Sequence, residues 1–170
     1  MVQELLTSCP LPLVLSVSAT TRPPREGEAD GVNYHFLSHE EFVQRRENDE
    51  FLECKEVFRQ GQWYGTLRSE VSTGLESGKW VLLEIDVEGA LSVLEQTPDA
   101  ITFFVHPGSL EELEKRLRHR GTDTEEAIHR RLETARHEMS LRHHYQHEVI
   151  NDDLPSAVEE ICRLLQRSGD

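Results

Sequence analysis

Apolar residues along this chain follow two patterns. Short runs of neighbouring apolar residues, typical of strands buried in a sheet, alternate with longer segments in which apolar residues recur about every three to four positions, as on one face of a helix. The short runs predict strands at residues 13–17, 51–58, 80–86, 101–105 and 148–150, with a turn into another strand at 61–66.

The helical segments carry recognisable start signals. Capping boxes, in which a Ser or Thr is followed three residues later by a Glu, predict helix starts at Ser38, Ser109 and Thr122. The helix predicted at 70–76 would place Val71 and Leu75 on its inner face. Further helices are predicted at residues 2–6 and 89–94, and a closing helix has Pro155 in its first turn.

Strands and helices therefore alternate along the chain. Because parallel neighbours need long crossover connections, this order predicts an α/β fold built on a parallel sheet. The strand-rich stretch near residues 31–67 predicts a mixed insert. The length of 170 residues fits a single domain, 1–170.

Charge excludes several classes of partner. The chain has 18 Lys and Arg against 32 Asp and Glu, a net charge of −14, which predicts repulsion from nucleic acid and from anionic membranes. No apolar run approaches the roughly 18 residues that a membrane span needs, and the N-terminus lacks a secretory signal pattern. Three widely spaced cysteines fit neither a metal site nor a disulfide framework. We therefore expect a cytoplasmic protein.

Residues 16–36, SVSATTRPPREGEADGVNYHF, form the first candidate site. Arg22 and Arg25 flank two prolines that stiffen the backbone. Each guanidinium can hold two oxygens of a phosphate at once. With Tyr34 nearby, the two arginines predict a clamp for a phosphate monoester. The alternative is a solvated loop with two surface arginines.

Acidic residues form the second and third candidate sites. Glu53, which is followed by Tyr64 and Thr66, could accept hydrogen bonds from the N1–H and the exocyclic amine of guanine; otherwise it is an exposed strand carboxylate. Glu84 and Asp86 end the predicted strand 80–86, and the carboxyl ends of parallel strands border ligand crevices. The alternative for this pair is a role as helix-capping or ion-paired acids.

Arginines concentrate between residues 115 and 131. Arg116 and Arg120 share one helix face, Gly121 interrupts the helix, and Arg131 lies on the next one. Two such helices, with their arginines turned inward, predict a lid that closes on a polyphosphate. The alternative is a salt-bridged surface hairpin.

Histidines cluster near the end of the second lid helix. His143 and His147 have the i, i+4 spacing of a metal-binding pair, but no other ligand or general base stands at a spacing typical of zinc enzymes. We therefore expect solvated histidines here, and no metal site.

Six stretches together resemble the guanylate kinase family, whose members phosphorylate GMP with ATP. They are SVSATTRPPREGEADGVNYHF, EFLE, WYGT, VLLEIDVEGA, LEELEKRLRHRGTDTEEAIHRRL and VINDDL. The stretches occur in family order at near-family spacing and cover almost the whole chain. The resemblance implies a nucleoside monophosphate kinase fold: a parallel-sheet core, a mixed GMP-binding insert at about 31–67 and a helical lid at about 115–142.

The resemblance also implies roles for individual residues. Those that match guanine-reading positions are Ser18, Glu53 and Thr66. Those that match ligands of the GMP phosphate are Arg22, Arg25, Tyr34 and Tyr64. Glu84 and Asp86 match an acidic pair beside GMP. The lid arginines that reach the ATP phosphates and the group in transfer are matched by Arg116, Arg120 and Arg131, and the adenine-side loop by Asn151 and Asp152.

One family element has no counterpart in these residues. The phosphate-binding loop G-x-x-x-x-G-K-[ST], which would hold ATP and Mg²⁺, occurs nowhere in the sequence, and neither does the strand that precedes it in the family. The family's reaction is the ATP-dependent phosphorylation of GMP to GDP. We expect the chain to be truncated at its N-terminus relative to the family and to show little kinase activity by itself. The alternatives are an inactive binding module for GMP or phosphopeptides, and a non-functional remnant.

Overall fold

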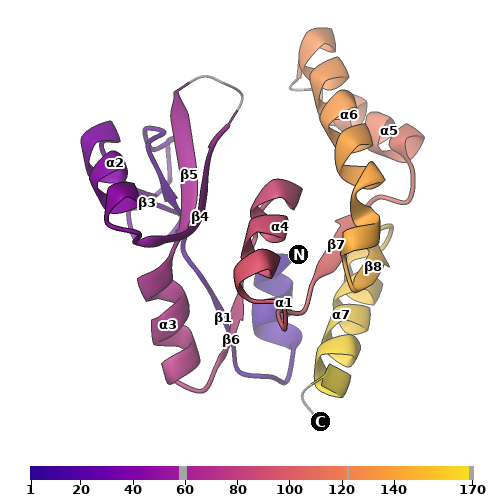
Figure 1. Cartoon of the computed structure of the whole chain (residues 1–170). Helices are drawn as coiled ribbons and strands as arrows, with labels where there is room; N and C mark the ends of the chain where they lie inside the picture. The colour runs from indigo at the N-terminus through magenta and orange to yellow at the C-terminus, as the bar shows by residue number, and fades with distance from the viewer. Residues whose placement is uncertain (58–60, 122, 169–170) are drawn as a thin grey trace. The chain divides into compact units, whose positions relative to one another are not determined.

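The computed structural model describes residues 1–57, 61–121 and 123–168 (Figure 1). The chain divides into two compact units, residues 2–98 and residues 99–170, and Met1 groups with the second. The first unit contains α1 (Val2–Ser8), β1 (Leu13–Leu15), β2 (Ala19–Thr20), β3 (His35–Phe36), α2 (His39–Glu47), β4 (Phe51–Val57), β5 (Gln62–Leu67), α3 (Arg68–Glu76), β6 (Trp80–Leu82) and α4 (Val87–Gln96). The second contains β7 (Phe103–His106), α5 (Leu110–Arg120), α6 (Glu125–Ser140), the 3₁₀ turn η1 (Arg142–His144), β8 (His147–Ile150) and α7 (Leu154–Ser168). In the described part of the chain, no helix could cross a membrane.

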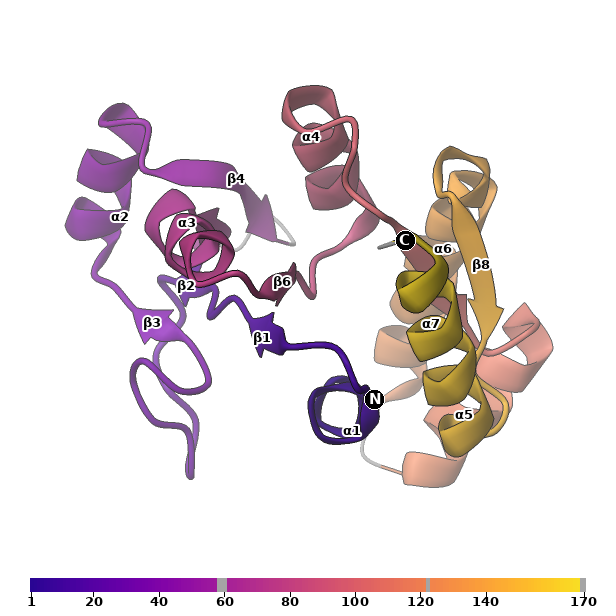
Figure 2. The same ribbon diagram turned by 90° about the horizontal axis from the view of Figure 1, so that it is seen from below.

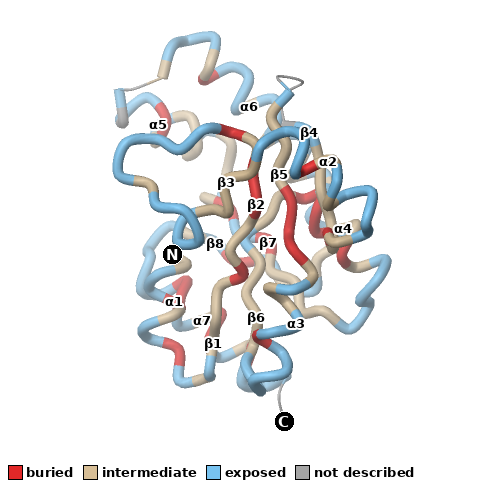
Figure 3. Tube along the Cα trace, turned by 90° about the vertical axis from the view of Figure 1, so that its left-hand side faces the viewer, coloured by how far each residue is buried: buried red, intermediate tan, exposed pale blue. Residues whose placement is uncertain are grey.

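A four-stranded mixed sheet dominates the first unit. Its order is β3-β2-β5-β4, with β2 and β3 parallel and the other pairs antiparallel. The buried core beneath it consists of Ala19, Phe42, Phe51 and Leu67, and the buried stretches of β2 and β5 are visible in Figure 3. The rings of Phe42 and Phe51 stack at 4.4 Å between centroids, which fixes α2 against β4. Three of its four strands lie in residues 31–67, where the sequence predicted a strand-rich insert, and β2 comes before that range.

The second sheet of this unit is the parallel pair β1–β6, on which α3 packs. Val14 lies opposite Val81 in the pair. The predicted inward position of Leu75 is wrong, since 59% of its surface is exposed. Gly74 makes the close contact instead: a Cβ at that position would lie 2.5 Å from Cγ2 of Val81. The helix therefore turns its smallest residue to the sheet and leaves Leu75 on the outer side.

The second unit is built on the parallel pair β7–β8. Phe104 lies opposite Glu148, and Val105 opposite Val149. Helix α7 runs beside β8 (Figure 2). Its buried face consists of Ala157, Val158, Ile161, Cys162 and Leu165. With the β1–β6 pair, this confirms the predicted α/β class with parallel strand pairing.

Helix starts test the predicted capping signals. Ser38 forms the complete capping box with Glu41. Ser109 accepts a hydrogen bond from the backbone N–H of Glu112 at 3.2 Å. The prediction at Thr122 is wrong, because the N-cap of α6 is Thr124, and Thr122 itself lies outside the described residues. Thr124 has the extended backbone that a cap needs, and its side chain accepts a hydrogen bond from the backbone N–H of Ala127.

Candidate nucleotide-binding site

The first unit contains a cavity of about 190 Å³. Its lining comes from the segment around β2, from the facing strands β4 and β5, and from the residues that follow β6. These lining residues are Ser18, Tyr34, Glu53, Tyr64, Gly65, Glu84, Ile85 and Asp86. Six of them were predicted as site residues, so the fold gathers positions up to 68 residues apart in the sequence (18 to 86) around one cavity.

Glu53 is the carboxylate that the sequence predicted to read a guanine base. The hydroxyl of Thr66, which is almost fully buried, donates to Oε1 of Glu53 at 2.7 Å. Burial raises the pKa of Glu53, and the charge of Asp86 raises it further, whereas the hydrogen bonds from Thr66 and the charge of Lys55 lower it. Thr66 therefore uses one acceptor position on Oε1. Because Glu53 lines the cavity, its carboxylate can still accept hydrogen bonds from a ligand there.

The N-terminus of α4 supports this carboxylate. Asp86 is the N-cap residue of α4 and accepts from the backbone N–H of Gly89 at 3.0 Å. A Cβ at Gly89 would lie 3.0 Å from Oε2 of Glu53, which is tighter than ordinary van der Waals contact. Glycine at this position therefore permits the carboxylate to lie against the first turn of the helix, where the helix dipole favours negative charge.

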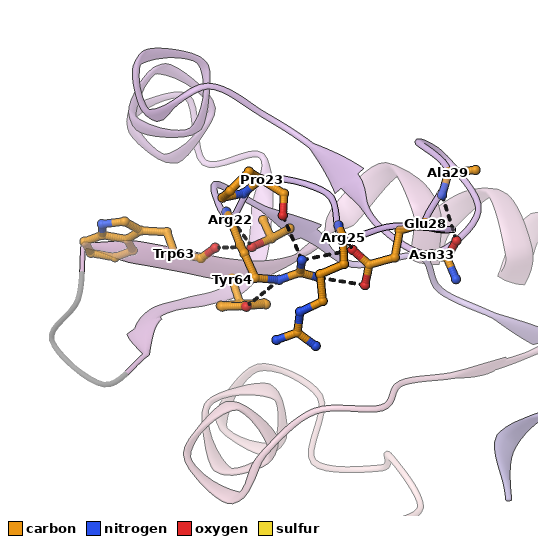
Figure 4. A network of polar contacts seen from close by, with 9 residues as sticks. Arg22, Pro23, Arg25, Glu28, Ala29, Asn33, Trp63 and Tyr64 are labelled. Carbon is orange, nitrogen blue, oxygen red and sulfur yellow. Dashed lines mark hydrogen bonds and ion pairs between the residues drawn. The ribbon is translucent and has the colours of Figure 1, made fainter. Parts of the chain in front are cut away.

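Arg22 is 93% buried and its guanidinium is held from several sides (Figure 4). Two of its nitrogens donate to the two carboxylate oxygens of Glu28, each at 2.9 Å. Its Nε donates to the hydroxyl of Tyr64 at 3.2 Å, and Nη1 also donates to the carbonyl of Pro23 at 2.8 Å. The ring of Tyr34 lies 5.3 Å from the guanidinium carbon, within cation–π range.

The predicted clamp of two arginines is present only in part. The Arg25 side chain is exposed and extends away from Arg22 (Figure 4). Its backbone N–H donates to Glu28 at 2.7 Å. The hydrogen bonds from Arg22 and from this backbone N–H lower the pKa of Glu28, so the carboxylate stays charged and keeps Arg22 in place. The anion that Arg22 holds in this structure is therefore the carboxylate of Glu28.

Two tyrosines complete this corner of the cavity. Tyr34 and Tyr64 meet edge to face at 5.9 Å between ring centroids. Because the hydroxyl of Tyr64 accepts from Arg22, its own proton is available to donate to a ligand. Burial raises the pKa of Tyr34, so its hydroxyl is also a proton donor at neutral pH. The cavity thus has donors at the corner beside Arg22 and an acceptor at Glu53.

The acidic pair after β6 does not lie on a strand. The strand ends at Leu82, four residues before the predicted end, so Glu84 and Asp86 belong to the following loop. Glu84 is exposed at the cavity wall. Asp86 caps α4, and its Oδ2 lies 2.5 Å from the ammonium of Lys55. For Asp86, the structure therefore agrees with the alternative interpretation of a helix-capping, ion-paired acid. Ser18 lines the same cavity.

In the second unit, the predicted lid is a hairpin of α5 and α6 whose arginines pair with protein groups. Arg116 donates to the carbonyl of Asn151 at 2.6 Å and to Glu112 at 3.1 Å. Arg131 lies 3.6 Å from Asp123. Arg120 ends α5, and its side chain lies outside what the structure describes. The alternative of a salt-bridged hairpin fits these contacts, and the role of the arginines toward phosphates stays a prediction.

Two further predicted positions, Asn151 and Asp152, directly follow β8. Asn151 is half-buried, and its backbone N–H donates to the carbonyl of His106 at 2.8 Å. Asp152 is exposed.

His143 lies 3.0 Å from the Ser140 carbonyl. Among the described residues, no group of three or more His, Cys, Asp or Glu side chains is placed to hold a metal ion.

Comparison with known proteins identifies the family. The guanylate kinase family profile matches residues 1–168. A guanylate kinase of Rhodopirellula baltica is 57% identical over 165 residues, which are 96% of this chain and 79% of that protein. The chain belongs to the guanylate kinase family. A guanylate kinase of Clostridium perfringens is 47% identical over 153 residues, covering 90% of this chain and 70% of that protein. The crystal structure of guanylate kinase from Anaplasma phagocytophilum matches with a TM-score of 0.80 and 32% identity, over 98% of this chain and 79% of that one.

Three residues of this guanylate kinase site were not singled out in the sequence. Glu28 pairs with Arg22, and Lys55 pairs with Asp86. Gly89 has no side chain and so leaves space for the Glu53 carboxylate beside the first turn of α4. The position of Lys55 two residues after Glu53 could have indicated that both side chains share one face of the strand. Nothing in the sequence pattern indicates that Glu28 folds back onto Arg22, because that contact depends on the turn at residues 25–28.

Proposed function

We propose that the cavity of residues 2–98 binds GMP and presents its phosphate as the acceptor in ATP-dependent phosphorylation to GDP. The observation that carries the proposal is that one half-buried carboxylate, Glu53, lines the same cavity as Tyr34 and Tyr64, and that the buried Arg22 donates to the hydroxyl of Tyr64 behind this wall. Guanine and phosphate monoester have the complementary groups. Family membership supports the same reaction.

In this proposal, Glu53 reads the guanine. Its carboxylate accepts from the N1–H and the exocyclic amine, two donors that adenine does not present together on this edge. Thr66 fixes the carboxylate by its hydrogen bond to Oε1, and Ser18, which lines the same cavity, contacts the base. Rejection of adenine then follows from polar groups that would be left unpaired, which costs more than a missing apolar contact.

The phosphate is bound by Arg22, Arg25, Tyr34 and Tyr64. Arg22 is already oriented by Glu28, so little side-chain entropy is lost when a phosphate arrives. Arg25, whose guanidinium is exposed, supplies a second charge without first breaking a buried contact. A GMP phosphate oxygen that is already ionised can act as nucleophile, so the acceptor side requires no general base.

The donor is ATP with Mg²⁺, as the family implies. Arg116, Arg120 and Arg131 neutralise charge on the transferring group, and Asn151 and Asp152 lie toward the adenine. Arg116 and Arg131 can take this role because a phosphate oxygen can replace their present acceptors, the carbonyl of Asn151 and the carboxylate of Asp123. Mg²⁺ commonly binds through substrate phosphates with only one or two carboxylates, so a preformed cluster of acids is not needed.

The test is nucleotide binding by calorimetry, because the sequence contains no phosphate-loop motif and turnover would not report on the acceptor site alone. We expect GMP to bind more tightly than AMP. Glu53→Gln replaces an acceptor with a partial donor and should weaken GMP binding roughly ten- to hundredfold, the value of a hydrogen bond to a charged group. Arg25→Ala should weaken GMP binding about tenfold and leave guanosine unaffected.

Glu95→Gln, an exposed carboxylate of α4, is the matched control and should bind GMP as the parent does. Unchanged GMP affinity in both site variants, in chains that remain folded by circular dichroism, would reject the proposed site. Tighter binding of a phosphopeptide than of GMP would favour a binding module instead.

A further inference from the structure

Lys55 bridges two acids at the start of α4. Its ammonium lies 2.5 Å from Oδ2 of Asp86 and 3.0 Å from Oε2 of Glu88. Burial lowers the pKa of Lys55, but the hydrogen bonds to these two acids outweigh it, so the net shift is upward and the side chain stays charged. About 30% of the Lys55 side chain is exposed, so water screens the pair only in part.

The cavity beside it carries an unusual charge for a nucleotide site. Three carboxylates, Glu53, Glu84 and Asp86, line it, and GMP adds a further negative charge. Around Glu53, the other titratable groups are Tyr34, Tyr64 and Glu84 on the cavity lining, Asp86 and Glu88 at the start of α4, and Cys54 and Lys55 on its own strand. Lys55 is the cation that acts on Glu53 in this group.

We propose that Lys55 is a positioning residue that neutralises Asp86 and thereby keeps Glu53 ionised to accept the donors of guanine. The inference rests on the proposed binding of GMP in this cavity. Lys55 is not among the residues that line the cavity, so it acts through Asp86 rather than on the base. Glu53 and Lys55 are two residues apart on β4, and the ammonium contacts the N-cap of the helix on which the Glu53 carboxylate rests.

A purely structural tie between β4 and α4 predicts a different result. Loss of such a tie would weaken GMP binding by the same factor at every pH. Loss of the neutralising charge would weaken it most at low pH, because the unpaired Asp86 makes Glu53 protonate more readily, and a protonated Glu53 cannot accept both guanine donors.

The experiment compares the parent chain with Lys55→Met, Lys55→Arg and Lys79→Met. GMP affinity is measured by calorimetry from about pH 8 to about pH 5, and the titration of the Glu53 carboxyl carbon is followed by NMR without nucleotide. Lys79 is an exposed lysine of the same unit and controls for the change in net charge. The GMP phosphate titrates in the same way in every comparison. The ratio of GMP affinities between two variants therefore reports only the titration of protein groups.

We expect Lys55→Met to bind GMP within about twofold of the parent at pH 8 and about three- to tenfold more weakly near pH 5.5, with Glu53 titrating at higher pH. Lys55→Arg and Lys79→Met should follow the parent. An affinity ratio that is constant with pH, or an unmoved Glu53 titration in Lys55→Met, would overturn the proposal. Failure of the parent itself to bind GMP would overturn the proposed function, whereas the NMR titration judges Lys55 independently of that outcome.

Discussion

Two glutamates of this protein show how far surroundings decide the chemistry of a side chain. The pKa of Glu53 is raised because the carboxylate is buried beside another acid. The pKa of Glu28 is lowered because Arg22 and the Arg25 backbone N–H both donate to it. The first residue is therefore the more easily neutralised of the two, and the second stays charged well into the acid range.

This difference predicts an acid-dependent stability for Glu28. Since its pKa in the folded chain is below the ordinary value, the unfolded chain binds the proton more readily, and stability rises with pH across that window. The contribution is complete above the ordinary glutamate pKa and is lost as pH falls through the lowered one. Glu28→Gln removes this dependence and should give a flatter curve of thermal midpoint against pH between about pH 6 and about pH 3, at about 0.15 M salt.

Glu26→Gln, two residues away and exposed, is the control for this measurement. It should keep the steeper acid loss of the parent chain. Identical curves for Glu28→Gln and Glu26→Gln would show that the contact with Arg22 does not contribute to stability.

Helix α3 illustrates how packing overrides local preference. Alanine is favoured over glycine inside a helix by up to about 1 kcal/mol. At Gly74, however, a Cβ would lie 2.5 Å from Val81 and 3.1 Å from Val14, both on the sheet beneath. Overpacking a well-packed contact costs about 1–3 kcal/mol, so the clash outweighs the propensity gain.

Gly74→Ala should therefore lower the free energy of unfolding by about 1–2 kcal/mol, measured by urea denaturation. Thr73→Ala is the comparison on the same helix, because Thr73 is exposed and alanine is the better helix former there. It should be neutral or slightly stabilising. A more stable Gly74→Ala chain would mean that α3 shifts away from the sheet at little cost.

The molecule as a whole distributes its predicted substrate contacts between two units. Every residue proposed for GMP lies in residues 2–98, and every residue proposed for ATP lies in residues 99–170. GMP that binds only the folded chain stabilises it by about 2.7 kcal/mol at a concentration of 100 times Kd. The segments that contact GMP should therefore open less often when GMP is bound.

Hydrogen exchange with GMP should therefore slow the amides of β2, β5 and the first turn of α4 by up to about 100-fold relative to the free chain. AMP at equal concentration is the control and should protect them less. Protection by GMP that is confined to residues 99–170 would contradict the assignment of the cavity.

Local patterns in the sequence were sufficient to predict the fold class, one helix start and much of the candidate site. Apolar periodicity predicted the α/β class, and the Ser38 capping box follows from side chains three residues apart. The motifs around Arg22 and Glu53, the acidic end of the predicted strand 80–86 and the resemblance to the family together predicted six of the residues that line the cavity. These features depend on neighbours in sequence, or on backbone geometry that the residue types themselves favour.

Other features depend on contacts between distant segments, and only the tertiary structure decided them. Leu75 lies outside because Gly74 packs closer to the sheet. Asp86 is a helix cap paired with Lys55 because β6 ends at Leu82 and the chain turns into α4. Arg22 holds Glu28 because a turn brings the two together. Periodicity reports which residues are buried on average, whereas the partner of a charged side chain is set by where the backbone carries it.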